Sequence, residues 1–145
     1  VCPPALYEEY MRLLAEGGLR DRVVFPNRFY SEAELLATAR GCHVGLALYD
    51  TEAGNFTHYA DPGKVKAYAE MQLPVIMTRI SDIAPFVERF GSGEVIDGTE
   101  ELGASIQRIR DNYSRYREGV ARFNDHFAYA RYYREAFKAL EGSWS

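Results

Sequence analysis

Cysteine and histidine are scarce in this chain of 145 residues, which has only two cysteines and three histidines. Cys2 and Cys42 are too few for a disulfide framework, and they form no cluster with the spacing of metal ligands. We therefore expect no metal site and no resident cofactor. Two unpaired cysteines also fit a reducing compartment, so we expect a cytoplasmic location.

Long apolar runs are absent as well, since no segment approaches the roughly 18 residues that span a membrane. We expect neither a transmembrane segment nor a signal peptide, which leaves only peripheral membrane contact open to a parent protein. The net charge of −4 argues against a broad nucleic-acid footprint. Because the chain starts at Val1 without a Met, we expect it to be a piece of a longer protein.

Apolar residues, in contrast, make up 47% of the chain and charged residues 26%, which is typical of a globular protein. The length suits one domain with a real core, so we expect residues 1–145 to form a single domain. Helical periodicities and short apolar runs alternate along the chain. The expected helices cover residues 6–15, 31–40, 63–71, 82–90, 99–110 and 113–140, with a break near 124–127, and the expected strands cover 22–25, 43–49, 74–78 and 94–96.

This alternation predicts an α/β fold. We expect a Rossmann-like domain with a parallel sheet of about four strands, helices on both faces and a helical C-terminal tail. Residues 43–49 are nearly all apolar, which favours a strand covered on both faces. Ser31 followed by Glu34 predicts a capping box, and Leu36 is expected to point inward. Asp82 is expected to cap the helix that follows it.

The segment Asp61–Thr78, DPGKVKAYAEMQLPVIMT, is the most informative part of the chain. Its Asp-Pro-Gly turn opens a helix, and the free N–H groups of a first helical turn attract anions. Gly63 lets a ligand approach the backbone and Lys64 adds a full charge, so the segment is a plausible diphosphate cradle. The alternative is an ordinary helix start followed by a buried strand. Ligands of parallel sheets bind beyond the carboxyl ends of the strands, which favours the first interpretation.

Taken in order, five segments resemble the C-terminal, donor-binding domain of GT-B-fold glycosyltransferases, most closely those of family 4 (glycosyl transferases group 1). They are Arg22–Phe25 (RVVF), Ser31–Tyr49, Asp61–Thr78, Phe86–Ile96 and the stretch from Glu100 to Leu140. The order and spacing of these segments carry the likeness. The resemblance implies a parent enzyme that transfers a sugar from a nucleotide-diphosphate sugar to an acceptor hydroxyl, as in polysaccharide biosynthesis.

The resemblance also implies roles for particular residues. Gly63 and Lys64 would grip the donor diphosphate, and Tyr49 to Glu52 would face the nucleotide. Phe25, Pro26 and Asn27 would contact the base. Arg28, in the same loop, could reach a phosphate or stack on the base. Basic groups and a helix terminus would neutralise the leaving diphosphate without a metal.

The acceptor site and the usual catalytic groups would lie in an N-terminal domain outside this chain, so we expect the isolated chain to be inactive. Two alternatives remain. The chain could be half of a GT-B-fold UDP-sugar epimerase, although the acid/base His and Glu of such halves are not seen. It could also be a non-catalytic binding domain, because Ala67 stands where the family has a ribose-binding Glu, and Glu70 lies one turn away.

Overall fold

The computed structural model describes residues 2–50, 59, 63–128, 133, 134, 136–138 and 140. The chain divides into two compact units, Val1–Ala37 and Thr38–Ser145, which are described separately below. Among the described residues, no helix combines the length and the apolar character needed to cross a membrane.

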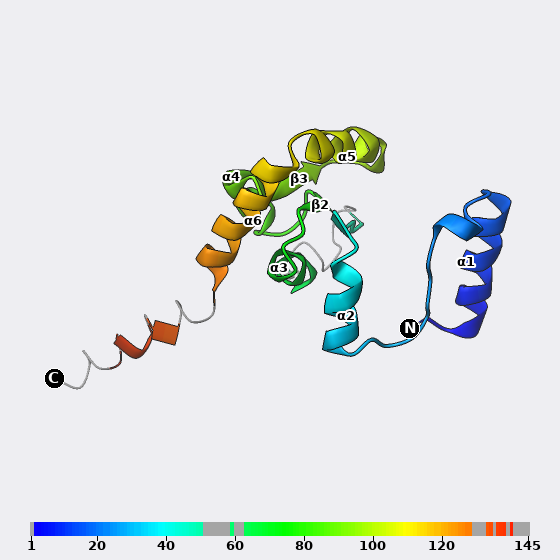
Figure 1. Ribbon diagram of the computed structural model, residues 1–145, viewed down its shortest axis with the longest axis horizontal. Coiled ribbons are helices and arrows are strands. Elements are labelled where there is room, and N and C mark those ends of the chain that lie inside the picture. Colours follow the sequence, from blue (N-terminus) through cyan, green and yellow to red (C-terminus); the bar gives the residue numbers. More distant parts are fainter. Residues whose placement is uncertain are drawn as a thin grey trace. The chain divides into compact units, whose positions relative to one another are not determined.

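The larger unit is built on a three-stranded parallel sheet of order β1-β2-β3 (Figure 1). The strands are β1 (Gly45–Ala47), β2 (Val75–Thr78) and β3 (Gly93–Ile96). In β1 and β2, Ala47 pairs with Met77, and in β2 and β3, Thr78 pairs with Ile96. Because the strands are parallel, their carboxyl ends meet at one edge.

Helices cover both faces of this sheet. They are α3 (Gly63–Glu70), α4 (Ala84–Phe90), α5 (Leu102–Asp111, preceded by η3, Thr99–Glu101) and α6 (Tyr113–Phe127). In Figure 1, β2 and β3 lie between α5 on one side and α3 on the other. Side chains of α3, α4 and α6 pack on Val75 and Met77, whereas Ile109 of α5 packs on Ile76. The predicted Rossmann-like α/β fold is therefore confirmed.

The smaller unit contains α1 (Pro4–Glu16) and η1 (Arg20–Arg22), and α2 (Glu32–Ala39) begins in it. α1 covers the helix expected at residues 6–15; Gly17 is its C-cap, and Gly18 follows with a φ of 64°. The predicted capping box is also present. The Ser31 N–H donates to Glu34 Oε2 at 2.9 Å, and the Glu34 N–H donates to Ser31 Oγ at 3.3 Å.

The predicted strand at residues 22–25 is wrong. Arg22 belongs to η1, Val23 follows it in extended backbone, and the side chains of Val23 and Val24 are exposed. Phe25 instead packs in its own unit, with ring centroids 5.5 Å from Tyr7 and 5.8 Å from Tyr10. Apolar side chains favour extended backbone, but a strand also needs hydrogen bonds from a neighbouring strand. A short apolar run does not show whether a neighbouring strand is present.

Three smaller expectations also fail. Residues of β1 alternate between buried and exposed, and Leu46 is 43% exposed, because α5 covers β2 and β3 rather than β1. Leu36 is exposed, since helical spacing shows which residues share a face but not what covers it. Asp82 does not cap α4, whose N-cap is Ile83 without a side-chain hydrogen bond.

Gly119 sets the distance between α6 and the turn after α4. A Cβ added at this buried residue would collide with the main-chain carbonyl group of Gly91. We expect Gly119→Ala to lower the free energy of unfolding by about 1–3 kcal/mol, the usual cost of overpacking. Urea denaturation measures this change.

Gly103 on α5 provides the matched control, because a Cβ there would meet nothing within 4 Å. Gly103→Ala should be neutral or stabilise the protein by roughly 0.5 kcal/mol, as expected for a helical glycine. Equal effects of the two substitutions would contradict the close approach of α6.

Candidate functional site

The candidate site lies where the three strands end. Tyr49 follows β1, Thr78 is the last residue of β2, and Asp97 follows β3. Thr78 is 4% exposed, and its hydroxyl makes two hydrogen bonds to the main chain of Tyr49. The Tyr49 N–H donates to Thr78 Oγ1 at 2.9 Å, and Oγ1 donates to the Tyr49 carbonyl oxygen at 3.0 Å. The segment that leaves β1 is therefore attached to the end of β2.

Lys64 lies beside this edge, in the first turn of α3. Its Nζ is 5.4 Å from the centroid of the Tyr49 ring, within the range of a cation–π contact. Burial raises the pKa of the Tyr49 phenol, so the ring is neutral at physiological pH. Within the described part of the chain, Lys64 forms no ion pair with a carboxylate.

Arg79, the residue after β2, has a different environment. Its guanidinium donates to Glu88 at 2.9 Å and to Asp97 at 2.9 Å. The hydrogen bonds to these two carboxylates raise the pKa of Arg79, and the hydrogen bond to Glu88 contributes most. Arg79 thus connects α4 with the end of β3, and its charge is already compensated. Of these two cations at the sheet edge, Lys64 is the one that lacks a carboxylate among the described residues.

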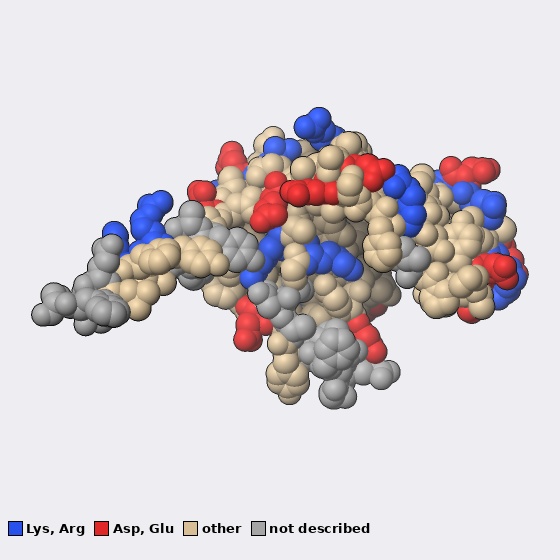
Figure 2. Space-filling view, turned by 90° about the horizontal axis from the view of Figure 1, so that it is seen from below, with Lys and Arg blue, Asp and Glu red and all other residues tan. Residues whose placement is uncertain are grey.

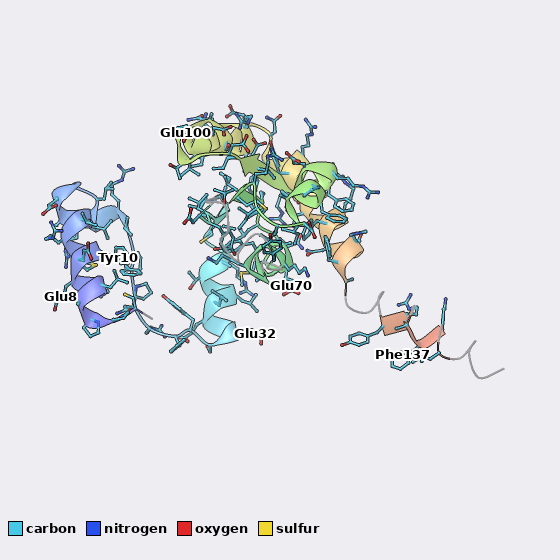
Figure 3. All side chains as sticks on the ribbon, turned by 180° about the vertical axis from the view of Figure 1, so that it is seen from behind. Glu8, Tyr10, Glu32, Glu70, Glu100 and Phe137 are labelled. Carbon is cyan, nitrogen blue, oxygen red and sulfur yellow. The ribbon has the colours of Figure 1, made fainter. Side chains whose placement is uncertain are left out.

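A second concave feature begins at the same helix start. A groove of about 500 Å³ runs between α3 and α6, and Gly63, Ala67 and Glu70 line its α3 side. Asn124 of α6 crosses it and donates to the Ala69 carbonyl oxygen at 2.6 Å. Glu70 lies on the outer part of α3 (Figure 3). Ala67 contributes no hydrogen-bonding side chain to the groove wall.

The comparison with protein families gives one match. The model of the glucosyltransferase 3-like C-terminal domain matches residues 18–140. The chain belongs to this family. Comparisons with curated proteins and with solved structures give no match. The predicted glycosyltransferase C-terminal domain is therefore confirmed at this level.

In this glycosyltransferase domain, the structure brings together only some of the predicted site residues. Lys64 and Tyr49 are in contact, and Gly63 begins α3, where no atom of the described residues lies within 4 Å of the position that a Cβ would take. Glu52 lies outside the described residues. Phe25, Pro26, Asn27 and Arg28 belong to the smaller unit.

The residues expected to contact a base make local contacts in the smaller unit. Besides the packing of Phe25 on α1, the Asn27 side chain accepts from the Cys2 N–H at 2.7 Å. Arg28 donates to Glu34 at 2.8 Å, and this hydrogen bond, together with those from Ser31, lowers the pKa of the Glu34 carboxyl to about 2. Arg28 also lies 4.4 Å from the Tyr30 ring centroid. Its charge is therefore already partnered.

The role of Thr78 is absent from the sequence-based site. The only signal was a polar residue closing the apolar run Pro74–Met77, and a threonine at a strand end is unremarkable by itself. Among the described residues, no group of three His, Cys, Asp or Glu side chains could hold a metal ion. Figure 2 shows basic and acidic side chains interspersed on the face turned to the viewer.

Lys64 and Arg79 should differ in their effect on stability. Arg79→Ala removes two partly exposed ion pairs and should lower the free energy of unfolding by about 0.5–1 kcal/mol, less in high salt. Lys64→Ala removes one cation–π contact at an exposed site and should cost about 0.5 kcal/mol, the low end of the usual range, because 5.4 Å is close to the distance limit of such contacts. Urea denaturation at low and high salt measures both, and a larger cost for Lys64 would make it a structural residue.

Proposed function

We propose that this domain holds the nucleotide-diphosphate sugar donor of a larger glycosyltransferase of the GT-B fold, similar to family 4. The observation that carries the proposal is Lys64, in the first turn of α3 at the carboxyl edge of the sheet. The family membership supports a transferase, and the location supports an anion, because ligands of such sheets bind at this edge. The parent enzyme would transfer the sugar to an acceptor hydroxyl held by an N-terminal domain.

The chemistry of the transfer explains why a cation is needed here. When the bond from the sugar to the diphosphate breaks, negative charge develops on the departing phosphate oxygens. Lys64 and the free N–H groups at the start of α3 can stabilise that charge because they are already in place before the reaction. We propose that this pair takes the part that a divalent cation plays in other transferases. Gly63 leaves room for the phosphates.

The nucleoside end of the donor needs separate groups. We propose that Tyr49 faces the nucleotide, because its ring lies beside Lys64 at the sheet edge. The groove between α3 and α6 begins at Gly63 and offers the Glu70 carboxylate near Ala67.

One observation favours a second candidate, a binding domain without catalytic function. Ala67 lines the groove without a polar group where a ribose-binding carboxylate is expected. A domain that binds diphosphate weakly and without preference for a nucleoside would fit this candidate. The two candidates differ in whether a nucleoside adds affinity to pyrophosphate.

Ligand titration tests the proposal directly. Inorganic pyrophosphate, UDP, GDP and ADP are added to the ¹⁵N-labelled chain, and amide shifts are followed. We expect shifts at residues 63–65 and tighter binding of one nucleotide than of pyrophosphate. Lys64→Ala should weaken binding at least about tenfold, the usual effect of losing a charged hydrogen bond. Equal affinity for all four ligands would favour the non-catalytic candidate.

Arg110→Ala is the matched control for this experiment. Arg110 lies on α5 and pairs with the neighbouring Asp111 at 3.0 Å, and it does not line the groove between α3 and α6. This variant should bind nucleotide within about twofold of the wild type. Absence of any shift near Lys64 would overturn the donor-site proposal.

The isolated domain should not catalyse sugar transfer, because the acceptor site and catalytic groups would lie in another domain. The measurement is release of nucleoside diphosphate from UDP-, GDP- and ADP-sugars in the presence of candidate acceptors. The parent protein serves as the positive control. Turnover by the 145-residue chain above background would contradict this division of labour.

A further inference from the structure

The two hydrogen bonds between the Thr78 hydroxyl and the Tyr49 main chain, called here the Thr78–Tyr49 bridge, occupy a particular place in the sheet. The regular pairing of β1 with β2 ends at Ala47 and Met77. Thr78 is the next residue on β2, and its side chain supplies both the donor and the acceptor to Tyr49, which lies two residues after Ala47. A side chain thus continues the connection between the strands after backbone pairing has stopped.

The bridge is protected from solvent on the Thr78 side. Thr78 is buried and is itself paired with Ile96 of β3, so its backbone is held by the sheet. A buried β-branched side chain has few accessible rotamers, so Oγ1 has a well-defined position. The direction in which the chain leaves β1 at Tyr49 is therefore determined by β2.

Tyr49 transmits this constraint to the candidate anion site. Its ring is the contact surface of Lys64, with Nζ 5.4 Å from the ring centroid. A cation on a flexible four-carbon stem needs such a support to lie at one place, because its rotamers otherwise spread the charge over a wide volume. The chain of contacts runs from Thr78 through the Tyr49 backbone and ring to Lys64.

We propose that Thr78 is a positioning residue for the donor diphosphate site: it fixes Tyr49 and thereby Lys64 without touching the ligand. This inference rests on the proposed function, because it assigns Thr78 to the anion site at Lys64. It goes beyond that proposal in naming the interaction that makes the site preorganised. Supporting contacts of this kind determine how precisely a binding group is held.

Two substitutions separate the hydroxyl from the shape of the side chain. Thr78→Val keeps the branched shape and removes both hydrogen bonds, whereas Thr78→Ser keeps the hydroxyl and removes a methyl group. Ile109→Val serves as the stability control, because Ile109 of α5 is buried against Ile76 on the other face of the sheet. It should destabilise the protein modestly without altering Tyr49.

Amide hydrogen exchange measures how well the Thr78–Tyr49 bridge protects the Tyr49 N–H, and it needs no ligand. In the wild type, the Tyr49 N–H is bonded to Thr78 Oγ1 and should be protected. We expect Thr78→Val to accelerate exchange at Tyr49 about tenfold more than at the neighbouring Ala47. Thr78→Ser and Ile109→Val should leave the ratio of the two exchange rates within about twofold of the wild type. An unchanged ratio in Thr78→Val would overturn the inference.

Calorimetry of inorganic pyrophosphate binding tests whether loss of the bridge weakens anion binding at Lys64. We expect Thr78→Val to weaken binding about three- to tenfold, and Thr78→Ser and Ile109→Val to bind within twofold of the wild type. If the wild type binds and Thr78→Val binds equally well, the positioning role fails while the proposed function stands. If the wild type binds neither pyrophosphate nor a nucleoside diphosphate, the proposed function fails, and the positioning role with it.

Discussion

The backbone hydrogen bonds of β2 to both of its neighbours are the interaction on which the larger unit depends. β2 is the central strand, and all four of its residues are buried. Val75 and Met77 belong to the core under α3, α4 and α6, whereas Ile76 belongs to the core under α5. Both hydrophobic cores therefore meet at one four-residue strand, and any shift of its register would move side chains between them.

The candidate site follows from the same strand. Thr78 ends β2 and connects it to Tyr49, and Arg79 connects it to α4 and to the end of β3. These contacts are made at the carboxyl edge of the sheet, where regular strand pairing ends and side chains bond to each other or to main-chain groups. Lys64 differs from Arg79 because it rests on an aromatic ring instead of a carboxylate. Among the described residues, Lys64 is thus a cation at this edge without a carboxylate partner, and the proposed donor site rests on it.

Much of this arrangement could be predicted from local sequence. The helix and strand of Asp61–Thr78, the helix at residues 6–15 and the Ser31–Glu34 capping box match the structure closely. Each depends on interactions within a few residues, such as a cap. The order of these elements also sufficed to predict a parallel α/β fold, because short alternating strands and helices have few other ways to pack.

What the sequence determined by itself was therefore the identity of these local elements and the charge at Lys64. Tertiary structure decided the rest. Val24 and Leu46 are apolar but exposed, because burial depends on which element covers a residue and not on its own hydropathy. Thr78 became a partner of Tyr49 only when β1 and β2 lay side by side, since 29 residues separate them in the chain. Contacts between distant segments arise from packing, and no local pattern encodes them.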